Sequence, residues 1–192
     1  MAVSRRHCTG RARQEIAAHR KAVAALPIEE LAGVAMALIS VFRKGGRLFL
    51  AGNGGSATMA AHIAAEFVGR FRRERFGWPA MALTDSAILT AVSNDLGFER
   101  VFARSVEAWV REGDCFWVLT TSGRSKNIVA AMKRARVQKA VCVAMAPIET
   151  PVTQYASYVI PAPEGAKSSA TQEVQLLAGH IICGLVEDAL CE

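Results

Sequence analysis

Four side chains in two helical segments are of the types that transfer protons or bind divalent metal ions. His62 and Glu66 are four residues apart, so both side chains emerge on one face of a helix. Gln172 and His180 are eight residues apart in the last helical segment and lie broadly on one face of it. Imidazoles and partly desolvated carboxylates have pKa values that suit proton transfer near neutral pH, so these residues are candidates for general acid and base catalysis.

Three roles are open to these residues from their spacing. Glu66 and His180 can act as the base and the acid that an aldose–ketose isomerisation needs for moving a proton between C1 and C2. All four, His62, Glu66, Gln172 and His180, can instead hold a divalent ion such as zinc, although Gln is an unusual ligand. The third role is structural, with a His62–Glu66 ion pair on a helix surface and His180 satisfied in the core. Spacing does not decide among the three.

Two segments rich in glycine and hydroxyl groups each follow an apolar run. They are Gly52-Asn53-Gly54-Gly55-Ser56 and Thr120-Thr121-Ser122-Gly123-Arg124-Ser125. Glycine lets the backbone approach an anion closely, and hydroxyl groups add donors for phosphate oxygens. Neither segment is a Walker A or G-x-G-x-x-G motif, which argues against a nucleotide. Tight strand-to-helix turns use the same residues, but two such loops at equivalent points of one sheet favour a phosphate site.

Alternating apolar runs and helical patterns must position these loops and helices. Strands are expected at 47–51, 79–83, 114–120, 139–145 and 158–160, and helices over 11–25, 28–43, 57–71, 126–136 and 168–190, with Asp85-Ser86 as a further helix cap. Continuous apolar strands separated by helices indicate a parallel sheet covered on both faces. No linker divides the chain, so we expect one domain over 1–192, with a helical arm at 10–44 and an α/β core at 45–192.

The chain is basic, with 23 Lys and Arg against 17 Asp and Glu and a net charge of +6. Much of this charge lies at the N-terminus and in Arg70, Arg72, Arg73 and Arg75. A basic surface suits an anionic substrate. Aromatic residues do not interleave with these charges, so nucleic acid is not expected as a partner.

Cysteine usage and hydropathy indicate a cytoplasmic protein. The five cysteines are scattered and form no C-x-x-C pair, as is usual in a reducing compartment. The longest apolar stretch of the first half, Leu31 to Phe42, is too short to span a bilayer. The basic N-terminus has no apolar segment behind it, unlike a secretory signal. No membrane association is expected.

Motifs along nearly the whole chain resemble, in the same order, those of the phosphoheptose (sedoheptulose 7-phosphate) isomerases, which have the sugar isomerase (SIS) fold. They are Gly52-Asn-Gly-Gly-Ser-Ala57, His62-x-x-x-Glu66, Gly69-Arg70-Phe71, Asn94-Asp95, Thr121-Ser-Gly-x-Ser125 and Gln172-Glu173 with His180. The resemblance implies an α/β fold, a flavodoxin-like three-layer α-β-α sandwich with a five-stranded parallel sheet. It also implies N-terminal helices used in oligomerisation and a homotetramer with sites at subunit interfaces.

The resemblance further implies conversion of D-sedoheptulose 7-phosphate to D-glycero-D-manno-heptose 7-phosphate through an enediol, for activated-heptose synthesis for lipopolysaccharide or other glycans. By the family pattern Glu66 is the base and His180 the acid. Some members carry zinc at the positions of His62, Glu66, Gln172 and His180, so one Zn²⁺ per subunit is a further expectation. The implied substrate and phosphate contacts are Asn53, Gly54, Gly55, Ser56, Arg70, Asn94, Asp95, Thr120, Thr121, Ser122, Ser125 and Gln172.

The chain departs from the family pattern before His180 and in the second loop. Members commonly read Ala/Asp-Arg-Ile-Gln-Glu-x-His, whereas this chain has Ser169-Ala170-Thr171-Gln172-Glu173-Val174-Gln175. The effect of these changes on substrate contacts is left open. Arg124 replaces a frequent Asn, and its charge could strengthen phosphate binding.

Two other functions remain open from the sequence. One branch that resembles these isomerases binds the DnaA replication initiator as a tetramer without catalysis. That branch lacks the pair that this chain retains at Glu66 and His180. An isomerase of another sugar phosphate would use the same acid and base, with a pocket of different length.

Overall fold

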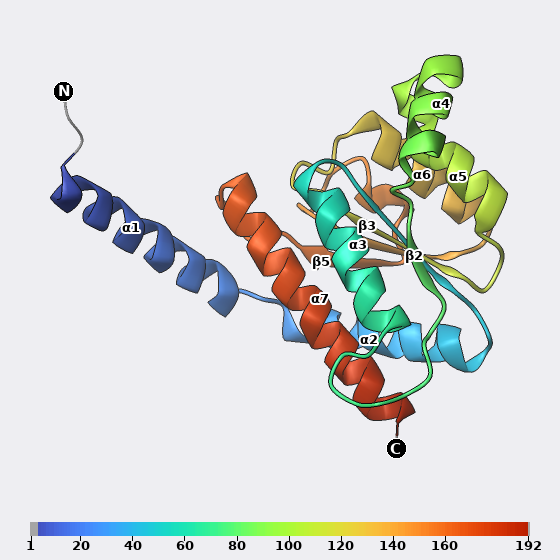
Figure 1. Cartoon of the computed structure of the whole chain (residues 1–192), viewed down its shortest axis with the longest axis horizontal. Coiled ribbons are helices and arrows are strands. Elements are labelled where there is room, and N and C mark those ends of the chain that lie inside the picture. Colours follow the sequence, from blue (N-terminus) through green and yellow to red (C-terminus); the bar gives the residue numbers. More distant parts are fainter. Residues whose placement is uncertain (1–3, 192) are drawn as a thin grey trace.

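A five-stranded parallel sheet forms the centre of the structure, a computed structural model that describes residues 4–191 (Figure 1). The strands are β1 (Leu48–Gly52), β2 (Ala80–Ala82), β3 (Cys115–Leu119), β4 (Val141–Ala146) and β5 (Tyr158–Pro161), in the order β2-β1-β3-β4-β5. Every neighbouring pair is parallel. All residues of β1 and β3 are buried, because helices cover both faces of the sheet. The predicted parallel sheet is therefore confirmed.

Alternate residues of each strand face opposite helical layers. Leu48, Leu50 and Trp117 face one core, which they share with α2 (Ile28–Arg43), α3 (Gly55–Val68) and α7 (Ser168–Leu190). Phe49 and Phe116 face the other core, shared with α5 (Val101–Trp109) and α6 (Lys126–Val137). The period of two along a strand separates the two sets of side chains. The result is the predicted three-layer α-β-α sandwich.

The segment between β2 and β3 forms helices that the sequence patterns only partly indicated. Asp85 caps α4 (Ser86–Leu96) by accepting a hydrogen bond from the backbone N–H of Ile88 at 2.8 Å, as the Asp85-Ser86 pair predicted. The short helix η1 (Phe98–Arg100) follows and leads into α5. None of the α4 residues is buried, and α4 stands out from the body of the molecule in Figure 1.

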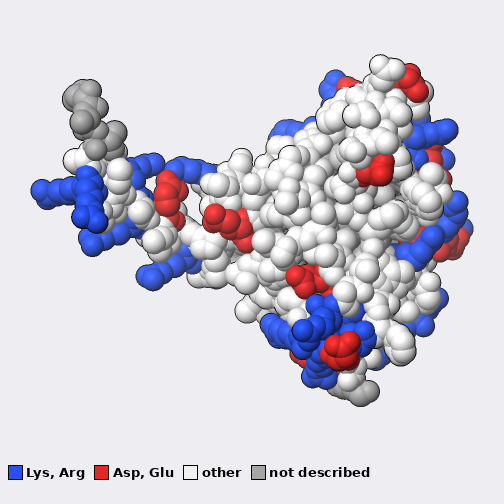
Figure 2. Space-filling view, viewed as in Figure 1, with Lys and Arg blue, Asp and Glu red and all other residues white. Residues whose placement is uncertain are grey.

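The first helix, α1 (Arg5–Ala24), projects from the body of the molecule (Figure 1). It begins before the expected residue 11, because Ser4 caps it by accepting from the backbone N–H of His7. Polar bridges join it to the start of α7, from Lys167 to Glu15 at 2.6 Å and from His19 to Glu173 at 2.8 Å. Lys and Arg side chains gather along α1 in Figure 2, so the N-terminal basic charge is on a helix that stands away from the sheet.

Within residues 4–191, no helix is by itself long and apolar enough to cross a membrane, whereas α1 and α2, bent by 63° at their junction, meet the length and composition criteria only as a pair.

The helix α3 ends three residues before its predicted end at 71. The chain leaves the helix at Val68, and the segment that follows turns back against the end of the helix. The backbone N–H of Trp78 donates to the carbonyl of Phe67 at 3.0 Å. Gly77 lies so close to Val68 that a Cβ atom there would overlap the carbonyl oxygen of Val68. Helical periodicity continued to residue 71 in the sequence, but the helix ends at its C-cap residue Gly69, and the returning chain packs against this end.

The N-terminal ends of β1 and β3 are joined through Asp114, which is 4% exposed. Its carboxylate accepts from the backbone N–H groups of Arg47 at 2.9 Å and Arg111 at 2.8 Å. It also pairs with the guanidinium of Arg47 at 2.8 Å. Buried donors that lose their acceptor cost free energy, so this carboxylate stabilises the edge of the sheet opposite the loops.

We expect Asp114→Ala to lower the free energy of unfolding by about 2 kcal/mol or more, because it leaves two backbone donors without an acceptor. Glu112→Ala is the matched control, since Glu112 pairs with Lys139 on the surface and such pairs contribute about 0.5 kcal/mol. Chemical denaturation of both variants measures the difference. Equal stability of the two variants would contradict this role for Asp114.

Candidate active site

The two glycine- and hydroxyl-rich segments lie side by side at the carboxyl ends of β1 and β3. These strands are neighbours, and the chain proceeds from β1 outward to β2 but from β3 outward to β4. Ligands of open α/β sheets bind at such a reversal of strand order. Asn53 and Asn127 join the two segments by a pair of amide hydrogen bonds of 3.0 and 2.9 Å. The sequence indicated both loops but gave no signal for Asn127, which is 3% exposed.

The first loop leads into α3 by a turn that requires glycine. A Cβ atom on Gly52 would lie 2.6 Å from the backbone of Ser56, and Gly54 has a φ of 54°. The backbone N–H of Ser56 donates to the carbonyl of Asn53, which closes the turn. Gly54 and Gly55 are exposed at the N-terminus of α3. Helix N-termini favour anions, so this loop has the geometry of a phosphate site.

The hydroxyl groups of the second loop differ in their surroundings. Thr120 is buried, and its hydroxyl accepts from the backbone N–H of Gly123 at 3.1 Å, so it shapes the loop. Ser122 is exposed, and its hydroxyl accepts from the N–H of Arg124 at 3.3 Å, which leaves its own O–H free to donate outward. Ser125 is the N-cap residue of α6 and its side chain makes no capping bond. Ser122 and Ser125 can therefore both donate to an anion.

The first turns of α7 lie against both loops. The side chain of Gln172 lies close to Gly55, where a Cβ atom would be 2.8 Å from its Nε2. Gln175 is buried and donates to the carbonyls of Thr120 at 3.2 Å and Met145 at 3.0 Å. Gln175, one of the departures from the family pattern, therefore supports the second loop from beneath. Its position before His180 in the sequence did not indicate this contact.

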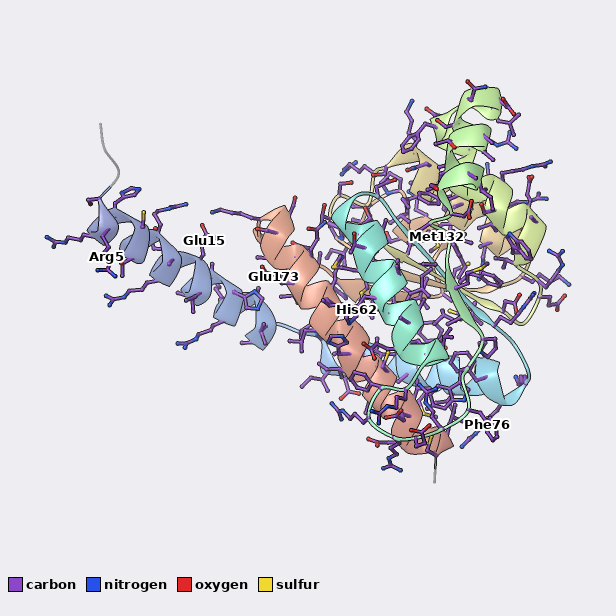
Figure 3. All side chains as sticks on the ribbon, viewed as in Figure 1. Arg5, Glu15, His62, Phe76, Met132 and Glu173 are labelled. Carbon is purple, nitrogen blue, oxygen red and sulfur yellow. The ribbon has the colours of Figure 1, made fainter. Side chains whose placement is uncertain are left out.

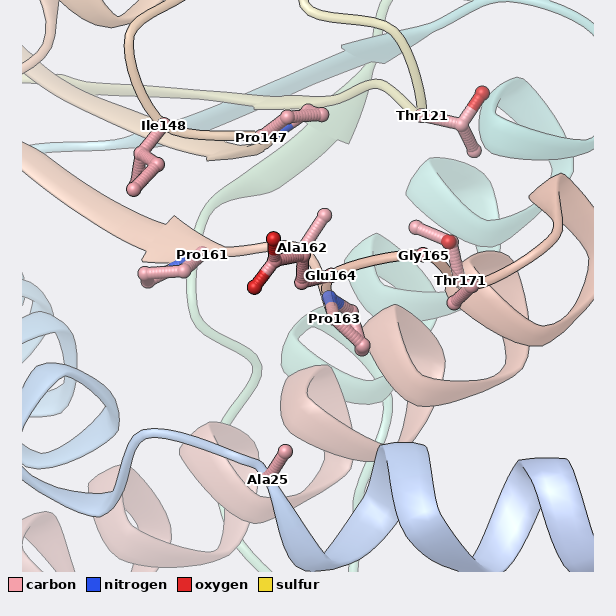
Figure 4. Close-up of a pocket in the computed structure, with 11 residues that line it drawn as sticks. Ala25, Thr121, Pro147, Ile148, Pro161, Ala162, Pro163, Glu164, Gly165 and Thr171 are labelled. Atoms are coloured by element: carbon pink, nitrogen blue, oxygen red, sulfur yellow. The ribbon is translucent and has the colours of Figure 1, made fainter.

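A hollow of about 560 Å³ opens beside the second loop (Figure 4). Thr121 and Thr171 line one side of it, and the Pro161–Ala166 segment after β5 lines another. Its described lining does not include His62, Glu66 or His180. The hollow adjoins the loop end of the site.

His62, Glu66 and His180 come together where α3 packs on α7. The Nε2 atom of His62 lies 2.9 Å from the Nε2 of His180 and 3.1 Å from the Oε1 of Glu66. The helices approach closely here, and glycine at position 179 permits it: a Cβ atom there would lie only 2.5 Å from the Cδ1 of Ile63. Figure 3 labels His62 at this junction. The His62–Glu66 ion pair of the structural interpretation is present, but His180 joins it.

The surroundings of His180 lower its pKa. Partial burial is the main cause, and the neighbouring His62 and Arg72 act in the same direction, while Glu66 opposes them. The ring of Phe71 stacks on it at a centroid distance of 5.6 Å. A lowered pKa keeps this imidazole neutral at pH 7, with one N–H to donate and one lone pair.

The donor set of this cluster fits a metal ion such as zinc. Its two imidazole nitrogens and one carboxylate oxygen all lie within 4.8 Å of one another, and these are the donor types of zinc sites. The facing Nε2 atoms of His62 and His180 can direct their lone pairs to one point. Gln172, the fourth predicted ligand, lies about 12 Å from His180 along the axis of α7. Within one chain, three of the four predicted ligands converge.

The loops and the cluster lie at opposite ends of α3. Ser56 is in its first turn and Glu66 in its last, about 15 Å apart along the helix axis. Asn94 and Asp95 are exposed on α4, where the amide of Asn94 donates to the carboxylate of Asp95 at 2.8 Å. Arg70 is exposed just beyond the end of α3. One chain therefore does not gather all the predicted site residues in one place.

Of the four arginines near residue 70, Arg70, Arg72 and Arg73 are exposed, as the sequence suggested, but Arg75 is not part of a basic surface. The side chain of Arg75 is 6% exposed and pairs with Glu187, which is 1% exposed. Arg73 pairs with Asp188 at 3.1 Å. Sequence reasoning missed Glu187, although an acidic residue directly after the apolar run 181–186 was an available signal.

Comparison with known proteins identifies the family. The SIS domain family matches residues 13–146. The phosphoheptose isomerase of Roseiflexus sp. is 45% identical over 164 residues, 84% of this chain and 83% of the relative. That of Aquifex aeolicus is 40% identical over 181 residues, 93% of this chain and 94% of the relative.

Solved structures agree with the sequence relatives. A phosphoheptose isomerase structure from Francisella tularensis has a TM-score of 0.87 and 30% identity, and covers 97% of this chain and 100% of its own. The chain therefore belongs to the SIS domain family and, within it, to the phosphoheptose isomerases.

Proposed function

We propose that this chain isomerises D-sedoheptulose 7-phosphate to D-glycero-D-manno-heptose 7-phosphate, for activated-heptose synthesis for lipopolysaccharide or other glycans. The observation that carries the proposal is the meeting of Glu66 and His180 in a chain that also has two phosphate-type loops. Relatives named phosphoheptose isomerase favour this enzyme over a DnaA-binding regulator and over an isomerase of another sugar phosphate.

The proposed chemistry uses one base and one acid. Glu66 removes a proton from C1 of the ketose while the N–H of His180 donates to the carbonyl oxygen on C2, which gives the enediol. Return of a proton to C2 and loss of the O1 proton then give the aldose, so no proton is gained or lost overall. A neutral His180, consistent with its lowered pKa, can donate and then recover its proton within one cycle.

The loops are proposed to bind the phosphate group. Ser122, Gly54 and Gly55 are exposed at the carboxyl edge of the sheet, and the hydroxyl of Ser125 makes no capping bond, so these residues have donors available for an anion. The other predicted contacts in this group are Asn53, Ser56, Thr120, Thr121 and Gln172.

We propose that the chain is a single domain that assembles as a homotetramer with sites at subunit interfaces. An extended heptose phosphate is shorter than the roughly 15 Å that separates Ser56 from Glu66 along α3. A site that combines the loops of one copy with the cluster of another would bring these groups closer than they lie within one chain. The exposed helix α4, which carries Asn94, Asp95 and the exposed apolar residues Ile88 and Leu96, and the projecting helix α1 offer surfaces for such contacts.

We also propose one zinc ion per subunit, held by His62, Glu66 and His180. Gln172 would join this set from a neighbouring copy, because it lies two turns away within its own chain. A bound zinc ion would polarise a substrate oxygen as a Lewis acid.

A cytoplasmic location is proposed from the thiols. All five cysteines are free, and burial raises the pKa of Cys142 to about 11 and that of Cys183 to about 12. Free buried thiols of low reactivity are usual in a reducing compartment.

Glu66→Gln and His180→Gln should each lower kcat for sedoheptulose 7-phosphate by about 100-fold or more, because each removes a proton-transferring group but keeps a similar shape. An NMR assay of the purified protein measures turnover, with size-exclusion chromatography to check assembly. Glu30→Gln and His7→Gln, both at exposed positions, serve as controls. Full activity in both site variants would refute the acid and base assigned here.

Ser122→Ala should raise KM about fivefold and leave kcat nearly unchanged, because a lost hydroxyl donor costs roughly 1 kcal/mol of phosphate binding. Steady-state kinetics of this variant and of Ser40→Ala, an exposed serine on α2, make the comparison. An unchanged KM for Ser122→Ala would show that the second loop is only a turn.

Protein purified without chelator should contain zinc, and His62→Ala should bind it at least about tenfold more weakly, because it removes one ligand. Elemental analysis and competition with a chromophoric chelator measure both quantities. His7→Ala is the control for general loss of a surface imidazole. Equal zinc affinity of the two variants would exclude this cluster as the metal site.

A further inference from the structure

Arg75 and Glu187 form a nearly buried ion pair between the end of α3 and the last turns of α7. The Nε of Arg75 lies 3.1 Å from the Oε1 of Glu187, and the two side chains are 6% and 1% exposed. A buried ion pair is stable only where further hydrogen bonds satisfy the remaining donors and acceptors. The groups that supply these bonds connect the pair to the catalytic helices.

The guanidinium of Arg75 caps the C-terminal end of α3. Its Nη2 donates to the carbonyl of Glu66 at 2.8 Å, and its Nη1 lies 2.9 Å from the carbonyl of Phe67 and 3.0 Å from that of Gly69. It also stacks 3.7 Å from the ring centroid of Trp78. A helix end has carbonyls without partners and a partial negative charge, both of which a buried cation satisfies. One of the carbonyls held in this way belongs to the proposed base.

The carboxylate of Glu187 holds the segment that follows α3. It accepts from the backbone N–H groups of Phe71 at 3.3 Å, Arg72 at 2.9 Å and Arg73 at 3.1 Å. Burial by itself would raise the pKa of Glu187, but these bonds and that from Arg75 outweigh it and lower the pKa, so the group is ionised at pH 7.

The same segment contacts the proposed acid. The ring of Phe71, whose N–H Glu187 holds, stacks on the ring of His180. Glu187 is itself seven residues after His180 on α7, two turns along the same helix. The ion pair therefore fixes the backbone at Glu66 on one helix and the packing around His180 on the other.

We propose that Arg75 and Glu187 are positioning residues that set the placement of Glu66 relative to His180 for isomerisation. This inference rests on the proposed function. Neither residue reaches the cluster with its own side chain, so both act through the ends of α3 and α7 and through Phe71. Because displacement of a catalytic group by about 1 Å can cost on the order of 100-fold in rate, loss of this pair should reduce kcat and not only stability.

The test compares variants of the pair with neighbours on the same helix. Glu187→Gln and Arg75→Lys should each lower kcat about tenfold or more with KM within about twofold, at a temperature where circular dichroism shows the protein folded. Arg75→Lys keeps the positive charge but loses the planar guanidinium that bonds several carbonyls at once. It therefore tests the proposal even if Glu187→Gln does not fold.

Two matched controls separate positioning from stability. Val186→Ala opens a cavity next to Glu187 and lowers the melting temperature, but it should leave kcat within about twofold. Asp188→Asn, at an exposed neighbouring carboxylate, should change neither quantity. An equal loss of kcat in Val186→Ala, or unchanged kcat in both pair variants, would overturn the proposal.

Crystal structures give a readout that does not depend on turnover. In crystals of the metal-free pair variants, the distance between the Nε2 atoms of His62 and His180, 2.9 Å here, should increase beyond hydrogen-bonding range. An unchanged distance in both variants would overturn the positioning role even if kcat fell. If the wild-type protein does not turn over sedoheptulose 7-phosphate, the proposed function fails, while this distance still tests whether the pair places the two histidines.

Discussion

The close packing of α3 on α7 is the contact on which the candidate active site depends. Gly179 leaves room for Ile63. His180 follows Gly179 and His62 precedes Ile63, so this close approach brings the imidazole of His180 to the His62–Glu66 pair. A Cβ atom at position 179 would lie 2.5 Å from the Cδ1 of Ile63, so a larger residue there requires Ile63 or the helices to shift. Beyond the cluster, the buried Arg75–Glu187 pair fixes the same two helices where α3 ends. Packing and buried electrostatics thus hold one interface at two points.

The length of helix α3 separates the anion-binding loops at its N-terminus from the histidine and glutamate near its C-terminus. Its N-terminus, with the exposed glycines and the neighbouring second loop, presents donors and a partial positive charge, which favour a phosphate group. Its C-terminal half carries His62 and Glu66, with the terminal carbonyls neutralised by Arg75 instead of by solvent. These ends are about 15 Å apart, which motivates the proposal of a site shared between copies. The exposed surfaces of α1 and α4 are consistent with such an assembly.

The regular elements of the fold could be predicted wherever burial imposed a simple pattern. The strands β1 and β3 are buried on both faces, so their sequences are continuous apolar runs followed at once by loop residues. The end of α3 was predicted wrongly, because the apolar periodicity runs past Gly69, which is the C-cap residue at which the helix stops. The return of Gly77 and Trp78 onto Val68 and Phe67 then packs against this end. The N-cap Asp85 was recognised by type, whereas α4 and α5 lacked an equally clear pattern. Sequence patterns therefore predicted an element correctly where its burial or its own residues determine it, as in β1 and β3 and at the N-cap of α4.

The sequence by itself determined the chemical groups: two loops with donors for an anion, and a glutamate and a histidine on helices of the right periodicity. Helical spacing placed His62 and Glu66 on one face because that relation is local. Only the tertiary structure decided that His180 joins them while Gln172 lies against Gly55, since eight residues of helix are a fixed length that no side chain spans. It also decided that Arg75 is a buried partner of Glu187 and not a surface cation, because burial and pairing depend on segments more than 100 residues apart.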